Sequence, residues 1–322
     1  MSALAVLDPL PHALAVDVLV ERARSFAESS SSSATRRAYA SDLRDFDAFC
    51  AAHGLASFPA TAQTIVLYVS SLGPTHKVAT IRRRLAAISV RHRRAGIEPS
   101  PCSHRIVRDV LDGIARTHGS AQRRVDAATL DLIGPMLLAV AGDDVAARRD
   151  RAILLLGFAT ALRRSELAAL DVADVHFSKK GLLLTIRRSK TDQEGHGTGI
   201  AVPIVANASL CAVRAVRAWL DASRVVSGAL FRTLTPHRAV TERRLDGRDV
   251  ANLVQRLAKR ARLEGDFSGH SLRSGFVTSA AQAHVSLDNI MRTTRHRSLA
   301  VVQTYVRRAD AFDAPALSSI IA

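Results

Sequence analysis

Hydrophobic residues recur three and four positions apart in four segments between residues 35 and 119. This period places them along one face of an α-helix, so each segment predicts a short amphipathic helix. Gly54 follows the first segment and Gly73 ends the second, and glycine is a common residue at helix ends. The four hydrophobic stripes are Tyr39–Phe49, Ile65–Leu72, Ile81–Ile88 and Ile106–Ile114. Residues 34–118 are therefore expected to fold as a helical domain.

The residues before this domain differ in character. Leu14, Val18 and Phe26 keep one helical period, and the run "ESSSSSAT" follows them. Serine runs are flexible and solvated. Residues 1–33 are expected to be an N-terminal tail that tethers the first compact domain.

A change of pattern after residue 118 predicts a second domain. The polar, basic stretch "THGSAQRRVDAAT" (117–129) is the expected linker, and the second domain covers 125–322. Helical periods at 130–140 and 145–162 lead into "GLLLTIRRSKTDQEGHGTGIAVPIV", which predicts two strands around a glycine-bearing turn. Helical periodicity then resumes to the end. The expected fold class is mainly α, with a small β-hairpin or sheet in the second domain, and 322 residues suit two domains.

The charge balance favours a polyanionic partner. The chain has 45 Lys and Arg against 29 Asp and Glu, a formal net charge of +16. Such an excess indicates nucleic acid before membrane. Six arginines without acidic neighbours in sequence lie within the third helical segment, and they are expected to contact DNA phosphates rather than to form an ordinary solvated face. They are Arg82, Arg83, Arg84, Arg91, Arg93 and Arg94.

Several classes of chemistry lack their sequence signatures. Cys50, Cys102 and Cys211 are too far apart for a disulfide frame or a zinc site. The chain has no apolar run of about 18 residues and no secretory signal pattern, so we expect a cytoplasmic protein without a membrane partner. Neither GxxxxGK[ST] nor HExxH occurs, and the acidic residues form no compact cluster. No metal and no cofactor are expected, so any phosphodiester chemistry must rely on arginine, lysine and histidine.

Three stretches carry candidate chemistry: "TALRRSEL" (160–167), "HSLRSGF" (270–276) and "TRHRSLAVVQTYVRR" (294–308). The spacing of His270 and Arg273 places both on one helix face. His296 and Tyr305 are nine positions apart, which on one continuous helix would point them to opposite sides. They converge only if a break intervenes, and Ser298 is a suitable N-cap for a helix that carries Tyr305.

These stretches, in this order, resemble the tyrosine recombinases, the phage-integrase family. The resemblance includes "ALRRSEL", a hairpin lysine in "RRSKT", "HSLR", and a histidine followed nine residues later by a tyrosine. It extends over almost the whole chain, because "TRRAYASDLRDFDAFC" is similar to the core-binding domain of the family and 125–322 to its catalytic domain. The implied function is a site-specific DNA recombinase, or integrase, that needs neither metal nor ATP.

The resemblance also implies residue roles. Arg163 and Arg273 match the arginines that clamp the scissile phosphate, a task to which guanidinium geometry is suited. His296 matches a further phosphate donor, and His270 matches the residue that assists proton transfer. Tyr305 matches the nucleophile that forms a 3′-phosphotyrosine.

Two further positions carry over less directly. Lys190 matches the hairpin lysine that protonates the departing 5′ oxygen, and a solvated turn lysine is the alternative. Glu166 matches an acidic position that supports the site, and a helix-surface carboxylate is the alternative.

One position departs from the pattern. The family usually has glycine directly before the second histidine, and this chain has Arg295. Glycine there often marks a turn with positive φ, which arginine adopts at some cost. Either the turn is ordinary, or Arg295 adds a phosphate contact while weakening the loop geometry.

Two other functions remain open at this stage. A type IB topoisomerase shares the chemistry but religates the same strand, and a basic DNA-binding protein would not cut at all. The expected partner is double-stranded DNA, with a homo-tetramer bringing two recombination sites together. Leu317, Ile320 and Ile321 in the tail are expected to pack on a neighbouring protomer or on their own domain.

Overall fold

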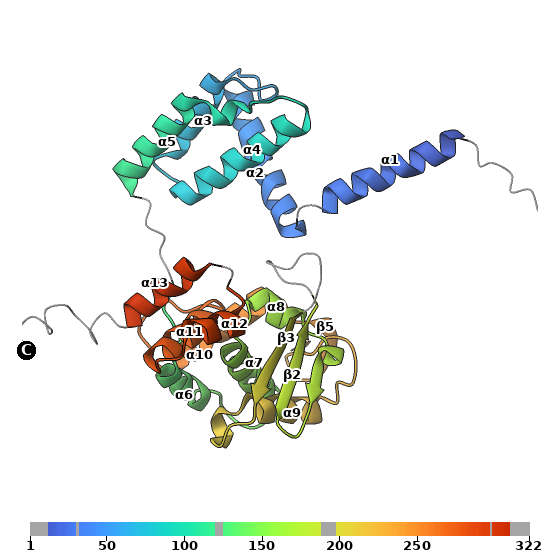
Figure 1. The fold of residues 1–322 in the computed structure, drawn as a ribbon, viewed down its shortest axis with the longest axis vertical. Helices are drawn as coiled ribbons and strands as arrows, with labels where there is room; N and C mark the ends of the chain where they lie inside the picture. Colours follow the sequence, from blue (N-terminus) through green and yellow to red (C-terminus); the bar gives the residue numbers. More distant parts are fainter. Residues whose placement is uncertain (1–11, 30–31, 120–124, 188–197, 297, 310–322) are drawn as a thin grey trace, which may run out of the picture. The chain divides into compact units, whose positions relative to one another are not determined.

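The computed structural model describes residues 12–29, 32–119, 125–187, 198–296 and 298–309 (Figure 1). The chain divides into two compact units, residues 1–123 and 124–322. Within the described ranges, no helix is long and apolar enough to cross a membrane. In the same ranges, no group of histidine, cysteine and acidic side chains is placed to hold a metal ion.

Unit 1 is helical, and its helices lie where the hydrophobic period predicts them. Its elements are α1 (His12–Ser29), α2 (Ser33–Ala52), α3 (Ala62–Leu72), α4 (Val78–Arg94) and α5 (Arg105–His118). The side chain of Ser32 accepts a hydrogen bond from the Thr35 amide and caps α2. The last serines of the run therefore begin a helix rather than continue a tether, because serine is a favoured N-cap. Residues 30 and 31 lie outside the described residues.

The core of unit 1 forms where α2, α3 and α4 meet. Phe46, Ile65, Tyr68, Ile81 and Ile88 are almost completely buried there. These residues belong to the predicted stripes, so the helical period correctly identified the buried faces of α2, α3 and α4. On α5 the prediction is only partly correct, because Leu111 is buried but Ile106 is 45% exposed. Tyr68 is thus a packing residue of the core.

Unit 2 surrounds the buried helix α7. Its helices are α6 (Leu130–Leu138), α7 (Val145–Thr160), α8 (Arg164–Ala169), α9 (Ala212–Ser223), α10 (Gly247–Arg260), α11 (Ser271–Gln282), α12 (Leu287–Thr294) and α13 (Leu299–Ala309). Residues 152–156 on α7 are buried on all sides. A helix that is apolar all round is buried, and here α9 and α11 pack against it.

A small antiparallel sheet also belongs to unit 2, with strand order β1-β2-β3. The strands are β1 (Val175–Phe177), β2 (Gly181–Ile186) and β3 (Thr198–Pro203), and Leu184 pairs with Ile200 in the register. The mainly α fold class with a small sheet is confirmed. The turn between β2 and β3, which carries Lys190, lies outside the described residues.

The expectation that only helices follow the hairpin is wrong. Strands β4 (Arg232–Leu234) and β5 (Val240–Arg244) form a second antiparallel sheet, and β1 adds a third strand to the first. Strands of three to five residues contain too few alternations to produce a recognisable period. Their pairing depends on contacts that the local pattern does not record.

A close backbone approach sets the position of α11. A Cβ on Gly275 would lie 1.8 Å from the carbonyl oxygen of Ala128. The Ala128 amide also donates a 2.9 Å hydrogen bond to the carbonyl of Ser271. The absence of a side chain at Gly275 therefore lets the segment before α6 cross the first turns of α11, where the candidate residues His270 and Arg273 lie.

Gly275→Ala should destabilise unit 2 by about 2 kcal/mol or more, because the added methyl group meets backbone atoms that cannot rotate away. Urea unfolding measures the loss. Gly113→Ala on α5 is the matched control, since a Cβ there meets nothing within 4 Å. The control should gain about 0.5–1 kcal/mol from the better helix propensity of alanine. Equal stability of Gly275→Ala and wild type would contradict the close approach.

Candidate active site

The candidate site includes the end of α7, where one residue has a left-handed backbone conformation. Ala161 has φ of 48°, and its backbone turn leads into Arg163, the N-cap residue of α8. The carbonyl oxygen of Ala161 accepts a 2.7 Å hydrogen bond from Nη1 of Arg273 on α11. Two arginines that are 110 positions apart in sequence are thus brought to one place.

Glu166 is the carboxylate between the arginines. Its Oε2 accepts from the backbone amide of Arg163 at 3.0 Å, as the N3 glutamate of a capping box does. Its Oε1 accepts from Nη1 of Arg163 at 2.6 Å, and Oε2 also accepts from Nη2 of Arg295 at 2.6 Å. Glu166 is buried, so the alternative of a helix-surface carboxylate is wrong.

The ionisation of Glu166 depends on these neighbours. Burial by itself would raise the pKa of Glu166, but the charge of Arg295 and the hydrogen bonds from Arg163 outweigh it and hold the pKa below its ordinary value. The carboxylate therefore stays charged at neutral pH. A charged, buried carboxylate forms strong, charge-assisted hydrogen bonds with both guanidinium groups, and these bonds hold both arginines in place.

Arg273 is 2% exposed in the first turn of α11. Burial, followed by the nearby charge of Arg163, lowers the pKa of Arg273 to about 10. It remains protonated at neutral pH. Its Nη2 is buried and makes no hydrogen bond within the described residues. This donor is free for an anion that enters the site.

His270 and Tyr305 lie next to each other. The Nε2 of His270 is 3.4 Å from the hydroxyl oxygen of Tyr305. The Tyr305 ring packs on a small cluster between α11, α12 and α13 that includes Val277, Ile290 and Val302. His270 is exposed on one side, and partial loss of hydration on the other, followed by the charges of Arg273 and Arg163, lowers its pKa. A neutral imidazole beside a phenol can accept its proton.

A threonine orients His296. Oγ1 of Thr294 is 2.6 Å from Nδ1 of His296 and 2.8 Å from the carbonyl oxygen of Ile290, to which it donates its proton. Since a hydroxyl has one proton, Nδ1 of His296 carries its own and donates to Thr294. Sequence reasoning missed Thr294, although a polar residue two positions before a candidate histidine was an available signal.

The surrounding charges keep His296 neutral. Burial, followed by the charges of Arg273 and Arg163, lowers the pKa of His296 to about 4. The break between His296 and Tyr305 is present, because α12 ends at Thr294 and α13 begins at Leu299, directly after Ser298. His296 and Tyr305 therefore both belong to the site despite their spacing.

Arg295 adopts the backbone conformation of the glycine that it replaces, with φ of 56°. The interpretation of this turn as ordinary is therefore wrong. A left-handed backbone costs a non-glycine residue about 1–2 kcal/mol. Its side chain turns inward to Glu166 and is 10% exposed.

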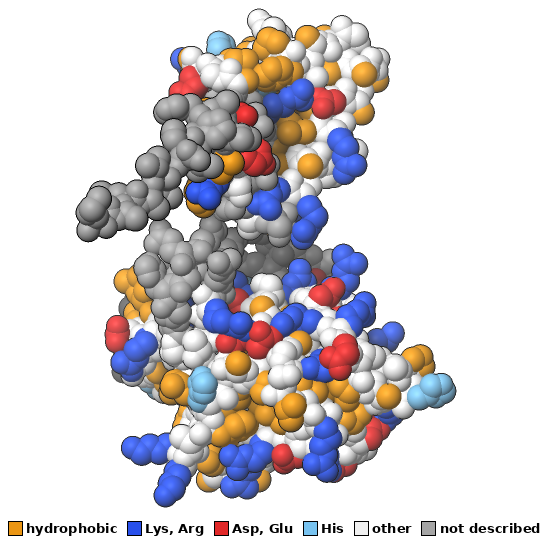
Figure 2. Space-filling view, turned by 90° about the vertical axis from the view of Figure 1, so that its right-hand side faces the viewer, with side chains coloured by type: hydrophobic (Ala, Val, Ile, Leu, Met, Phe, Trp, Pro, Cys, Tyr) orange, Lys and Arg blue, Asp and Glu red, His pale blue; other side chains and the backbone are white. Residues whose placement is uncertain are grey.

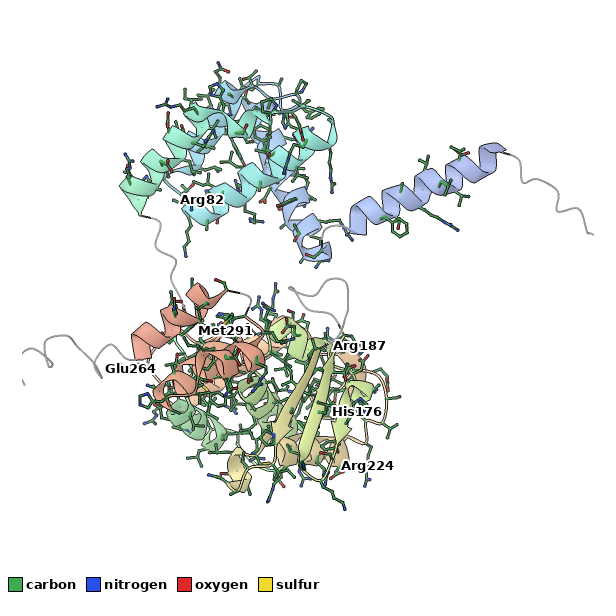
Figure 3. All side chains as sticks on the ribbon, viewed as in Figure 1. Arg82, His176, Arg187, Arg224, Glu264 and Met291 are labelled. Carbon is green, nitrogen blue, oxygen red and sulfur yellow. The ribbon has the colours of Figure 1, made fainter. Side chains whose placement is uncertain are left out.

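Lys190 lies outside the described residues, as do Leu317, Ile320 and Ile321. The described residues extend to Arg187, at the base of the β2–β3 hairpin. Arg187, labelled in Figure 3, directly follows β2 and forms ion pairs with Asp171 and with Asp174, the latter at 2.7 Å. Arg244 on β5 pairs with the same Asp171. The hairpin is thus tied at its base to the segment after α8.

The six arginines of α4 divide into two kinds. Three form ion pairs with carboxylates of α2: Arg83 with Asp42 at 3.1 Å, Arg84 with Asp45 at 2.5 Å, and Arg91 with Asp47 at 2.6 Å. Arg82, Arg93 and Arg94 are exposed and form no ion pair within the described residues. Figure 3 shows Arg82 extending from α4, and Figure 2 shows lysine and arginine side chains on both units with carboxylates among them.

Comparison with known proteins places this geometry in context. Residues 135–311 match the model of the phage integrase family. The chain is 37% identical over 302 residues to an "Integrase/recombinase xerD homolog" of Selenomonas ruminantium, covering 92% of this chain and 88% of that protein. It is 27% identical over 297 residues to "Recombinase cre" of Escherichia phage P1, covering 83% and 82%.

Solved structures share the fold. The lambda integrase (residues 75–356) bound to DNA superposes with a TM-score of 0.59 at 16% identity, covering 91% of this chain and 95% of that one. The XerH site-specific recombinase in a post-cleavage complex gives 0.57 at 16% identity, covering 81% and 71%. At these identities the likeness concerns the fold.

The depressed pKa of His296 predicts a pH dependence. Between its ordinary value of 6.5 and the folded value of about 4, the unfolded chain binds more protons at this residue than the folded protein does. The unfolding free energy should therefore fall as pH decreases through this window, by up to about 1.4 kcal/mol per pH unit for this group. Urea unfolding of wild type and His296→Gln, without DNA, measures it. Parallel pH profiles for the two proteins would contradict the buried neutral imidazole.

The division of the α4 arginines predicts different salt responses. Arg82→Gln should lower the slope of log affinity for DNA against log salt by about 1, because one phosphate contact is lost. Arg84→Gln is the matched comparison, since its side chain is 12% exposed and bonded to Asp45. It should leave the slope nearly unchanged and lower the stability of unit 1. Equal slopes for wild type and Arg82→Gln would show that Arg82 does not contact DNA.

Proposed function

The chain belongs to the phage integrase family, and we propose that it is a site-specific DNA recombinase that cleaves and rejoins strands through a 3′-phosphotyrosine on Tyr305. Its homologues are tyrosine recombinases, enzymes that break and rejoin DNA. The observation that carries the proposal is the short distance between the Tyr305 hydroxyl and Nε2 of His270, beside Arg163 and Arg273.

The proposed cleavage step conserves atoms and charge. The phenolic oxygen of Tyr305 attacks the scissile phosphorus and its proton passes to Nε2 of His270. The bond between phosphorus and the 5′ oxygen breaks, leaving a 3′-phosphotyrosine. The departing 5′ oxygen takes a proton, for which Lys190 is the proposed donor. A 5′ hydroxyl from another strand reverses these steps, so no ATP is needed.

Cations support the transition state of this step. Arg163 and Arg273 carry guanidinium groups that suit the oxygens of a phosphate, and fixed donors stabilise charge as it develops. His296 is the proposed third donor. Its Nδ1 is bound to Thr294, so a proton on Nε2 is required for donation, and an adjacent phosphate favours that protonated form.

The proposed partner is double-stranded DNA. The net charge of +16 and the exposed arginines of α4 support it. Unit 1 is the proposed core-binding domain and residues 125–322 the proposed catalytic domain. A homo-tetramer on two recombination sites, a role in DNA integration and a cytoplasmic location belong to the same proposal.

The two alternatives explain fewer observations. A basic DNA-binding protein would not need a tyrosine and a histidine in contact beside the buried Arg273 and the half-buried Arg163. A type IB topoisomerase shares the chemistry. However, the relatives from Selenomonas ruminantium and from phage P1, which match most of this chain, are both named recombinases. The recombinase is therefore the better-supported function.

Tyr305→Phe should abolish covalent capture of DNA. On a nicked duplex whose short 5′-hydroxyl fragment diffuses away, the wild-type protein should accumulate as an adduct on the 3′ phosphate. The substitution removes one oxygen and almost no volume, so fold and DNA affinity should persist. Denaturing gel electrophoresis of the adduct and mapping of the linked residue provide the measurement.

Tyr39→Phe is the matched control, because Tyr39 lies on α2 in unit 1 and should not affect capture. Tyr68 is less suitable, since its hydroxyl donates to Asp45 at 2.6 Å and accepts from Arg84. An adduct that survives in Tyr305→Phe, or one on a 5′ phosphate, would overturn the recombinase.

A further inference from the structure

We propose that Arg295 is a positioning residue, which acts through Glu166 to tie the turn that carries His296 to the turn that carries Arg163. The inference rests on the proposed function and extends it to a residue that replaces the usual glycine of the family. It concerns the alignment of the site rather than direct contact with the phosphate.

The conformation of Arg295 is the first observation. Its backbone is left-handed, with φ of 56°, and its side chain is 10% exposed. Glycine would adopt this backbone without strain and would bury no charge. A buried arginine at such a position requires a compensating contact, and Nη2 supplies one at 2.6 Å from Oε2 of Glu166.

The second observation is how the two oxygens of Glu166 are shared. Oε1 accepts from the side chain of Arg163, while Oε2 accepts from the Arg163 backbone amide and from Arg295. The carboxylate therefore bridges the start of α8 and the end of α12. Since His296 follows Arg295 directly, this bridge sets the distance between His296 and Arg163.

The contacts and exposure of Arg295 favour positioning over phosphate contact. Its Nη2 bonds to the carboxylate of Glu166, whereas Nη1 of Arg273 bonds to a backbone carbonyl. Both side chains keep buried donors without a hydrogen bond within the described residues, so this feature does not separate their roles. Arg163 also bonds to Glu166, but its side chain is 24% exposed against 10% for Arg295, and it keeps donors that can reach a ligand. Arg295 thus acts through Glu166.

Arg295 also keeps Glu166 ionised. Burial raises the pKa of Glu166, and the charge of Arg295 lowers it, together with the hydrogen bonds and the charge of Arg163. The other titratable groups of the site are Arg273, His270, His296 and Tyr305. On its other side Glu166 lines a pocket with the charged residues Asp171, Asp174, Arg187 and Arg244. Removal of Arg295 should raise the pKa of Glu166, and a protonated Glu166 would lose one of its acceptor oxygens.

The test is a double-mutant cycle between Arg295 and Glu166. Single-turnover cleavage of the nicked duplex is measured for wild type, Arg295→Gln, Glu166→Gln and the double variant. Arg295→Gln should cleave about tenfold to hundredfold more slowly with DNA affinity retained, as expected for misplacement remote from the reacting atoms. The double variant should be no slower than Glu166→Gln alone, because both substitutions break the same bridge.

A pH series separates positioning from a general loss of structure. The deficit of Arg295→Gln should grow as pH falls, because the raised pKa of Glu166 lets the carboxylate protonate sooner. In the Glu166→Gln background this extra pH dependence should vanish, which controls for His270 and His296. Arg295→Lys keeps the charge and should restore part of the rate.

Two glycine variants control for the backbone. Arg295→Gly suits the left-handed turn, so it provides a folded protein that lacks the bridge, and it should also cleave slowly. Arg262→Gly is the matched control, because Arg262 has the same φ of 56° and an exposed side chain. Arg262→Gly should cleave at the wild-type rate.

The outcomes are distinct. Wild-type cleavage by Arg295→Gly or Arg295→Gln would overturn the positioning role. Multiplicative losses in the double variant would also overturn it, since Arg295 would then act independently of Glu166. The same four proteins can also be compared by their unfolding free energies, a measurement that does not depend on cleavage. If the effects of the two substitutions on the unfolding free energy are additive, the bridge between Arg295 and Glu166 is refuted. A wild-type protein that forms no adduct would instead overturn the recombinase.

Discussion

The buried carboxylate of Glu166 is the interaction on which the rest of the site depends. Among the described residues, Arg163 and Arg295 both form ion pairs with it. Arg273 lies close enough for the charge of Glu166 to stabilise its protonated form. Three guanidinium groups without a carboxylate would repel each other in a buried place. The carboxylate of Glu166 offsets part of this repulsion, and the site keeps an excess of positive charge. The negative charge of an entering phosphate would neutralise that excess.

Backbone geometry brings these side chains to the carboxylate. Ala161 and Arg295, both with left-handed backbones, end α7 and α12 and direct the following residues into the site. Gly275 lets another segment cross α11 closely enough to set where that helix begins. Arg273 then bonds to the carbonyl of Ala161. The site is thus assembled from helix ends on a buried scaffold, which favours precise placement.

Unit 1 shows how tertiary structure changes the meaning of a charged segment. Along the sequence, the arginines of α4 have no acidic neighbours. In the fold, carboxylates of α2 bind three of them, and Tyr68 joins the pair formed by Arg84 and Asp45. Arg82, Arg93 and Arg94 are exposed without an ion pair among the described residues, and Arg83 is 45% exposed beside Asp42. The contact of the six arginines with DNA phosphates stays a prediction.

The sequence by itself determined helices α2 to α7, the β2–β3 hairpin and the family. Helical periods and short ordered motifs are local, so the side chains that must be buried and the residues His270, Arg273 and Tyr305 were identifiable from the chain alone. It also marked Arg295 as a departure, and the positive φ expected for a glycine position is present. Strands β1, β4 and β5 were too short to give a period.

Only the tertiary structure decided which residues are partners. The Arg295–Glu166 bridge joins residues 129 positions apart, and the ion pairs of Arg83, Arg84 and Arg91 join α4 to another helix. The contact of Thr294 with His296 spans two positions, yet it required the turn at the end of α12. A local pattern reports which face of an element is buried, whereas the partner of a charged group depends on the path of the chain between elements.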